Sequence, residues 1–230
     1  TGVGLMDCKK VLVEVEGDLE QAVKKLREKG LAKAAKKSDR STNEGKVFVS
    51  VNDAEKKAVI IELNCETDFV ASNDSFSECG QALANAILEQ TITDVDSLDT
   101  VSVNGSSYKD FVADFVLKLG ENITLKTIKF LSGHERVSSY IHMNGKIGVL
   151  VAFNGQVDDE FATGVAMHVA AAQPVYLKRE DVDASELENE KDIIRSQSLK
   201  EGKPEAIVDK IVEGRIGKYY KEICLLEQAY

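Results

Sequence analysis

The segment Cys65–Asp74, with the sequence CETDFVASND, lies where a strand pattern gives way to a helix pattern. The apolar run Ala58–Leu63 precedes it, and polar residues at its end can cap a following helix. Between the two patterns an acid, Asp68, stands beside a large aromatic, Phe69. Functional groups are common on such connecting segments. Phe69 could point outward as a wedge with a charged tip, or it could fill the local core while Asp68 caps a turn.

The residues on either side of this corner predict a sheet covered by helices. Alternation over Lys46–Val51, followed by a turn and by Ala58–Leu63, indicates a β-hairpin. Helical stripes follow at Phe76–Leu88 and Ser107–Leu119, and Ile123–Phe130 is typical of a further strand. Short hairpin connections favour antiparallel sheets with helices on one face, which is an α+β fold.

A second unit then repeats the first. Arg136–His142 and Lys146–Phe153 resemble the first hairpin, and a helix starting after Asp158 follows them. We expect two further helices, one over Ser185–Lys200 capped by Ser185 with Glu188, and one from about Glu205 to Tyr219. Apolar residues of the last helix form a narrow seam suited to a helical hairpin or coiled coil, namely Ile207, Ile211, Val212 and Ile216.

The N-terminal part predicts a small helical module. Asp7–Val15 forms one segment, and Asp18 with Gln21 resembles a capping box for a second helix that Gly30 ends. Residues 31–45 have the composition of a linker and include a short basic patch of Lys33, Lys36, Lys37 and Arg40. The chain starts with Thr1 in the middle of an element, and no strand closes the second unit before Tyr230. We therefore expect a fragment truncated at both ends.

Composition excludes several classes of protein. The 230 residues are 43% hydrophobic and 30% charged, which is a globular balance, and no signal peptide or membrane-spanning run is present. The net charge of −10 argues against nucleic acid as the main partner, because phosphate binding needs a basic face. Four scattered cysteines without a CxxC pair exclude a zinc ribbon and predict a reducing compartment.

The sequence contains no recognisable catalytic or metal-binding motif. Cys65 could be a nucleophile or a buried small residue at a strand end, and the absence of a neighbouring base favours burial. The three histidines lack ligand spacing, so we predict no metal site and no cofactor. His168 lies in an alanine-rich helix that could either approach another surface or pack closely within the domain.

Several segments, in the same order along the chain, resemble the elongation factor Ts family. They are Thr1–Lys10, Cys65–Ala71, Lys146–Leu150, Ala166–Ala170 and Glu213–Arg215. The resemblance implies four parts: a ubiquitin-associated-like helical module lacking its first helix (1–38), a core N-subdomain (39–132), a core C-subdomain (133–203) and the start of a helical hairpin (204–230). The family also has a helix before this module, and a returning helix and closing strand after the hairpin.

The resemblance further implies guanine nucleotide exchange on elongation factor Tu during translation, by a protein that is not itself an enzyme. It assigns displacement of the partner's Mg²⁺ to four residues of the corner, Thr67, Asp68, Phe69 and Val70. It assigns partner binding to Leu5, Met6, Lys9, Ile147, Gly148 and His168. No direct nucleic-acid or membrane contact is expected, a homodimer through the hairpin is possible, and the location is the bacterial cytoplasm or, less favoured, an organellar matrix.

Two other functions compete with nucleotide exchange. The first is a non-catalytic assembly protein that associates through its helical hairpin, and it predicts loss of function when residues 204–230 are removed. The second is a thiol enzyme that uses Cys65, and it predicts loss of activity on alkylation of this residue. Neither explains the ordered series of matching segments.

Overall fold

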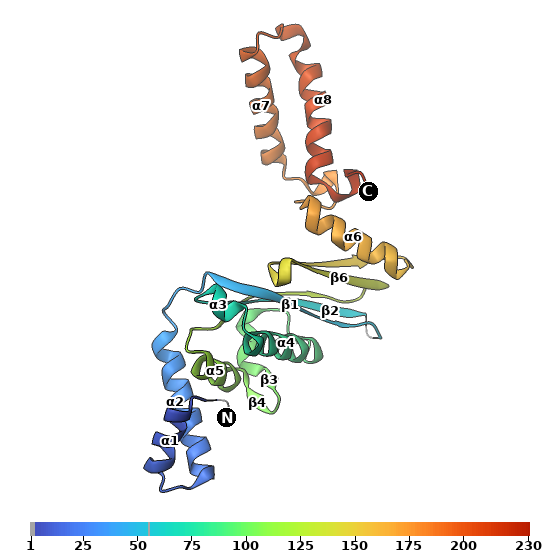
Figure 1. Ribbon diagram of the computed structural model, residues 1–230. Coiled ribbons are helices and arrows are strands. Elements are labelled where there is room, and N and C mark those ends of the chain that lie inside the picture. The colour runs from blue at the N-terminus through green and yellow to red at the C-terminus, as the bar shows by residue number, and fades with distance from the viewer. Residues whose placement is uncertain (1–2, 55) are drawn as a thin grey trace. The chain divides into compact units, whose positions relative to one another are not determined.

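The computed structural model describes residues 3–54 and 56–230 of the chain. It has mixed helices and antiparallel strands, which confirms the predicted α+β class (Figure 1). The chain forms two compact units, Thr1–Ala166 and Met167–Tyr230, and the division between them falls within helix α6 (Asp159–Ala172). The finer four-part division expected from the family resemblance stays a prediction.

Two helices begin the first unit, α1 (Leu5–Glu14) and α2 (Leu19–Lys37). They pack on each other through the buried residues Val11, Ala22 and Leu26. The carboxylate of Asp18 accepts hydrogen bonds from the backbone N–H groups of Glu20 and Gln21, each at 3.0 Å. Asp18 is thus confirmed as the cap, because these N–H groups have no partner within the helix itself. The reciprocal bond of a capping box was predicted wrongly, since the backbone N–H of Asp18 donates to the carbonyl of Val15 and not to Gln21.

The predicted end of this helix at Gly30 was wrong. Helix α2 continues to Lys37, and a Cβ placed at Gly30 would come within 3.4 Å of the carbonyl oxygen of Ala113 in α5 (Tyr108–Leu119). Gly30 is therefore a buried position where α2 faces α5, and it does not end the helix. The predicted linker over residues 31–45 is accordingly reduced to a short segment that starts at Ser38, and most of the basic patch lies on the last turns of α2.

A three-stranded antiparallel sheet forms the centre of the first unit. Its order is β1 (Glu44–Asn52), β2 (Lys57–Cys65) and β5 (Thr124–Leu131), so β2 is the middle strand. Alternate residues of β2 face a core shared with α5 and with α4 (Asp74–Glu89), and Phe76 of α4 is fully buried there. The hairpin, both helices and the third strand are thus confirmed.

The opposite face of β1 and β2 contacts the hairpin β6 (Arg136–His142) and β7 (Ile147–Phe153) (Figure 1). Helix α6 follows β7, as the predicted repeat requires, and Asp158 accepts a hydrogen bond from the backbone N–H of Phe161 at 2.7 Å. Short elements complete this unit: β3 (Ser102–Val103), β4 (Ser106–Ser107) and the 3-10 turns Val95–Thr100 and Met143–Gly145.

The second unit is built around the helical hairpin of α7 (Ala184–Lys200) and α8 (Glu205–Ile223). Asp183 caps α7 by accepting from the N–H groups of Ser185 and Glu186, so the predicted cap by Ser185 was wrong. The longer aspartate side chain, two positions earlier, reaches these donors. The unit also contains the 3-10 turns Arg179–Asp181 and Leu225–Glu227.

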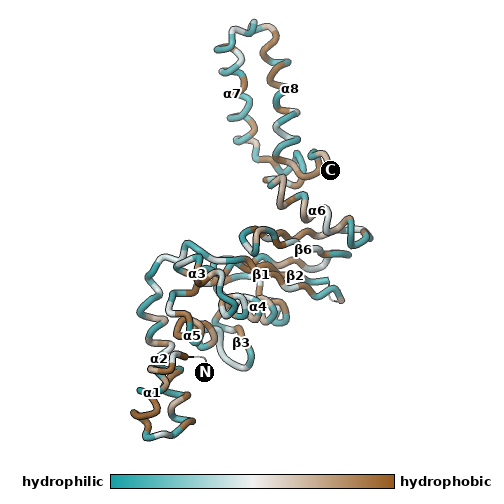
Figure 2. Tube along the Cα trace, in the orientation of Figure 1, coloured by the Kyte–Doolittle hydropathy of each residue, from teal (hydrophilic) through white to brown (hydrophobic). Residues whose placement is uncertain are grey.

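The seam between α7 and α8 differs from the prediction at the start of α8, where Val208 takes the place predicted for Ile207. Val208, Val212 and Ile216 are buried against Ile194, whereas Ile207 is 43% exposed. Positions 208, 212 and 216 repeat every four residues and so share one face of α8. Most of α7 is hydrophilic, as Figure 2 shows, which agrees with so narrow a seam. Within the described part of the chain, no helix combines the length and apolarity that crossing a bilayer requires.

Candidate functional site

The Asp68–Phe69 corner connects the end of β2 to a one-turn helix, α3 (Asp68–Ala71). The Thr67 hydroxyl caps α3 by accepting from the backbone N–H of Val70 at 3.3 Å. Val70 packs against the core and Ala71 is buried. The Phe69 side chain, in contrast, is 83% exposed. The turn is therefore held by its last two residues and presents its aromatic residue to solvent.

This geometry decides between the two interpretations of the corner. Phe69 does not fill the core, because its side chain is exposed, whereas Phe76 of α4 is a core residue. Asp68 does not cap the turn, because Thr67 does so. The Asp68 carboxylate is exposed, and no described residue forms a hydrogen bond or ion pair with it. The corner is thus an outward aromatic wedge beside a carboxylate that is open to a ligand.

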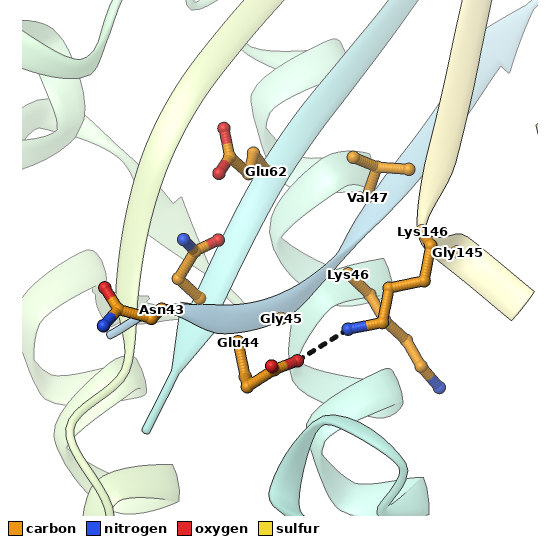
Figure 3. Close-up of a pocket in the computed structure, with 9 residues that line it drawn as sticks. Asn43, Glu44, Gly45, Lys46, Val47, Glu62, Gly145 and Lys146 are labelled. Atoms are coloured by element: carbon orange, nitrogen blue, oxygen red, sulfur yellow. Dashed lines mark hydrogen bonds and ion pairs between the residues drawn. The ribbon is translucent and has the colours of Figure 1, made fainter. Parts of the chain in front are cut away.

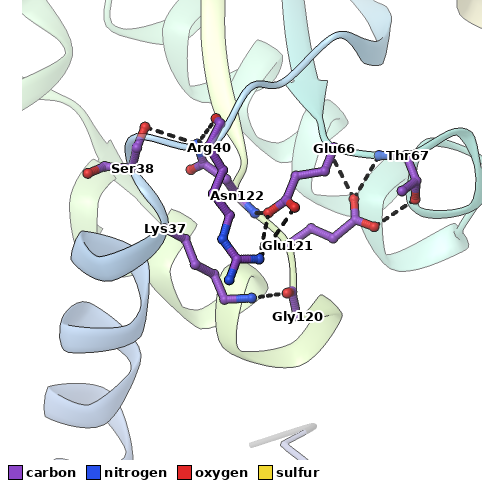
Figure 4. A network of polar contacts seen from close by, with 8 residues as sticks. All are labelled: Lys37, Ser38, Arg40, Glu66, Thr67, Gly120, Glu121 and Asn122. Atoms are coloured by element: carbon purple, nitrogen blue, oxygen red, sulfur yellow. Dashed lines mark hydrogen bonds and ion pairs between the residues drawn. The ribbon is translucent and has the colours of Figure 1, made fainter.

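A network of polar contacts holds the corner from below (Figure 4). One carboxylate oxygen of Glu121 accepts from the backbone N–H groups of Glu66 and Thr67, both at 3.0 Å. Its other oxygen accepts from the Thr67 hydroxyl at 2.6 Å. The Glu66 carboxylate in turn accepts from the backbone N–H of Asn122 at 2.7 Å. The turn at 121–122 and the corner are therefore bonded to each other in both directions.

Cys65, at the end of β2, has the properties of a structural thiol. Its side chain is fully buried, and its Sγ donates to the carbonyl of Thr67 at 3.2 Å. Burial, with a smaller contribution from the negative charge of Glu121, raises the pKa of the Cys65 thiol to about 11. A thiol with this pKa is almost entirely protonated at neutral pH, so it is a poor nucleophile.

Ile147 and Gly148 begin strand β7, close to the corner in the first unit. Lys146 forms an ion pair with Glu44 of β1 at 2.7 Å across a shallow pocket (Figure 3). Glu44 is also the direct partner of Cys65 in the β1–β2 ladder. One ion pair and one strand pairing thus connect the start of β7 to the residue that precedes the corner.

Gly148 has a packing role that its predicted binding role did not include. A Cβ at this position would lie 2.4 Å from Cδ1 of Ile60 and 2.7 Å from Cγ2 of Val47. Both neighbours are side chains of the central sheet. A Cβ would force these side chains to shift, so glycine favours the close approach of β7 to β1 and β2. Ile147, which is half-buried, remains available in part at the surface.

His168 lies on α6 and belongs to the second unit. Its Nε2 is 2.9 Å from Oε1 of Gln228, and its ring meets that of Tyr230 edge-on, with the centroids 5.9 Å apart. The side chain is half-buried. Both interpretations of this residue, close packing and approach to another surface, thus stay open.

The three N-terminal candidates lie together on α1. Leu5 is 84% exposed, Met6 is 63% exposed and Lys9 is exposed. Leu5 and Lys9 also line an apolar groove with Cys8, Leu12 and Val13. Exposed apolar residues at this density are typical of a binding surface.

No sequence pattern indicated a role for Glu121 or Asn122. They follow Gly120, whose left-handed φ of 81° ends α5, and they precede β5. Their partners lie more than fifty residues away along the chain. The only local signal was the glycine, which predicts a turn but not what the turn holds.

An exposed aromatic residue on a braced corner, with further exposed apolar residues on α1, is typical of a protein that binds another macromolecule. Among residues 3–54 and 56–230, no group of three or more His, Cys, Asp or Glu side chains could hold a metal ion. A family model described as Elongation factor TS matches residues 66–230. The chain belongs to the elongation factor Ts family, the nucleotide exchange factors for elongation factor Tu in translation.

Proposed function

We propose that this chain binds elongation factor Tu in its GDP-bound form and promotes release of GDP by disturbing the Mg²⁺ site of that partner. The observation that carries the proposal is the 83% exposure of Phe69 on a turn whose two following residues are anchored in the core. A phenylalanine this exposed gives up few contacts within its own chain when it enters a partner. The free energy gained by burying its side chain can therefore contribute to binding.

The proposed mechanism divides the work between neighbouring residues. A GTPase holds GDP through its phosphate loop and through Mg²⁺, which bridges phosphate oxygens and a loop hydroxyl. Phe69 would insert between helices of the partner and displace them, while the free carboxylate of Asp68 would compete for polar groups around the metal. Thr67 and Val70 hold the wedge in place from either side. Loss of Mg²⁺ coordination then weakens GDP binding.

The size of the effect requires more than one contact area. Burial of one phenylalanine is worth about 1.5–3 kcal/mol, and each tenfold change in rate needs about 1.4 kcal/mol. Phe69 alone thus supplies about a ten- to hundredfold acceleration. We propose that the α1 residues Leu5, Met6 and Lys9, the β7 edge at Ile147 and the surface around His168 supply the remaining binding energy.

The test is the release of a fluorescent GDP analogue from elongation factor Tu, followed by stopped-flow fluorescence. We expect Phe69→Ala to lower the accelerated rate about ten- to hundredfold, and to weaken complex formation less. Unfolding of Phe69→Ala should occur at the wild-type temperature, because exposed substitutions change stability little. Unchanged GDP release by this variant would overturn the proposal.

Leu199→Ala is the matched control, and it also tests the assembly alternative. Leu199 is an exposed apolar residue at the far end of α7, on the hairpin through which the rival function would operate. The exchange proposal expects no change in GDP release for this variant. A hairpin-based assembly function, such as a homodimer through the hairpin, expects a change in sedimentation and none in exchange.

The remaining expectations follow from the same proposal. The partner is a protein, and no direct contact with nucleic acid or membrane is proposed. A factor of translation elongation works beside ribosomes, so we propose a cytoplasmic location.

A further inference from the structure

We propose that Glu121 is the positioning residue of the Asp68–Phe69 corner, and that its carboxylate sets how effectively Phe69 acts on the partner. This inference rests on the proposed exchange function. Little packing fixes the Phe69 side chain, because 83% of it is exposed to solvent. Its direction is therefore set by the backbone of the turn, and Glu121 holds that backbone.

The hydrogen bonds explain why this carboxylate matters. The N–H groups of Glu66 and Thr67 lie between the end of β2 and the start of α3. Neither the strand nor the helix provides acceptors for both of them. Both donate to Glu121 Oε2. Part-buried backbone donors left without an acceptor are costly, so their loss would favour another backbone conformation.

The bond to the Thr67 hydroxyl extends this effect to the helix cap. An ionised carboxylate can only accept, so the 2.6 Å contact commits the hydroxyl proton of Thr67 to Glu121. A lone pair of Oγ1 is then directed to the N–H of Val70, which it meets at 3.3 Å. Phe69 lies between Thr67, which provides the cap, and Val70, whose N–H group donates to it. Glu121 thus orients the cap of the turn that carries the wedge.

Glu121 itself comes from a well-anchored turn (Figure 4). Asn122 is buried, and its backbone N–H donates to Glu66 while its side-chain amide donates to the carbonyls of Ser38 and Arg40, at 3.2 and 3.0 Å. The carbonyl of Gly120 accepts from the ammonium group of Lys37. The turn therefore has fixed points on both sides of Glu121, so its carboxylate is a stable support.

Preorganisation is the physical benefit. A one-turn helix such as α3 is unstable by itself, because helix nucleation is unfavourable. Without Glu121, the turn would have to become ordered while Phe69 enters the partner. Ordering one residue of backbone corresponds to about a tenfold change in an equilibrium constant. For a variant without Glu121, we therefore expect about a tenfold lower rate of GDP release at saturating chain concentration. The chain concentration that gives half of the maximal rate should change little.

The experiment uses the full chain and stopped-flow release of a fluorescent GDP analogue from the partner GTPase, over a range of chain concentrations. Glu121→Ala should lower the maximal rate about tenfold. Glu121→Gln keeps one acceptor oxygen and should give an intermediate rate, and it replaces the alanine variant if the latter does not fold. Glu89→Ala removes an exposed acid at the end of α4 and should match wild type, which controls for the loss of one negative charge.

A double variant separates positioning from general destabilisation. If Glu121 acts only through the wedge, Glu121→Ala should lower the rate no further in a chain that already carries Phe69→Ala. A GDP-release rate of the double variant that falls by the product of the two single effects would overturn the inference. Wild-type rates for both Glu121 variants, together with a slow rate for Phe69→Ala, would also overturn it. A wild-type chain that does not accelerate GDP release would instead refute the exchange function itself.

Discussion

Phe69 and Phe76 show, at the scale of single residues, how position decides the use of a side chain. They are seven positions apart, on either side of the Asn73 cap, and one is 83% exposed while the other is fully buried. Phe76 contacts Phe48 across the core, with ring centroids 6.1 Å apart. The buried ring stabilises the fold, and the exposed ring is free to act on a partner.

Gly148 gives a prediction at the same scale. Gly148→Ala should destabilise the first unit by about 1–3 kcal/mol, because the added methyl group would overlap with Ile60 and Val47. Chemical denaturation of the variant measures this loss. Gly155→Ala is the control, since a Cβ there meets nothing within 4 Å, and it should be close to neutral. A stable Gly148→Ala variant with weakened partner binding would instead show that Gly148 acts mainly as a contact residue.

At the scale of elements, the helical hairpin is joined at its base by one carboxylate. Glu186 on α7 accepts from the hydroxyl of Tyr176 at 2.6 Å and from that of Tyr219 on α8 at 2.5 Å. These two hydrogen bonds lower the pKa of Glu186 below its ordinary value, and the bond from Tyr176 has the larger effect. The same bonds raise the pKa of both tyrosines. The segment before α7, the helix α7 and the helix α8 are thus held together in one place.

This arrangement predicts a dependence of stability on pH. Since the folded-state pKa of Glu186 is lowered, its contribution is fully present above the unfolded value of about 4.3, and is lost as the pH falls through the folded value. Thermal unfolding of Glu186→Gln should therefore occur at a lower temperature than that of wild type at pH 7, and the difference should shrink below about pH 4. A difference that stays constant down to pH 3 would contradict this assignment.

Glu213→Gln provides the matched control. Glu213 is an exposed acid on α8 that forms no hydrogen bond or ion pair with any described residue. Its substitution should leave the unfolding temperature unchanged at each pH. Asp183 and Glu227 also have lowered pKa values, so only the difference between variant and wild type reports on Glu186.

At the scale of the whole molecule, the proposed function is a thermodynamic coupling between two ligands of the partner. If the chain weakens GDP binding to elongation factor Tu by some factor, then GDP must weaken binding of the chain by the same factor. Dissociation constants measured around the four-sided cycle should agree, with a coupling of about 5- to 150-fold or more. Strong release of GDP without a matching loss of chain affinity would show that an additional species takes part.

Local pattern was sufficient for most of the secondary structure. The β1–β2 and β6–β7 hairpins, helices α4 and α5, and the capped start of α2 all follow from periodicity and capping residues. The wrong prediction at Gly30 has a long-range cause. Gly30 was interpreted as a helix end because glycine commonly ends helices, but its contact with Ala113 lies more than eighty residues away in sequence.

By itself, then, the sequence determined the α+β class, the order of the elements, the strand-to-helix corner at Asp68–Phe69 and the resemblance to the elongation factor Ts family. Only the tertiary structure decided that Phe69 points outward, that Gly148 is a packing position and that Glu121 supports the corner. Each of these depends on partners brought together from distant parts of the chain. Periodicity reports which face of an element is apolar, and it contains no information about which distant carboxylate will meet a given backbone N–H group.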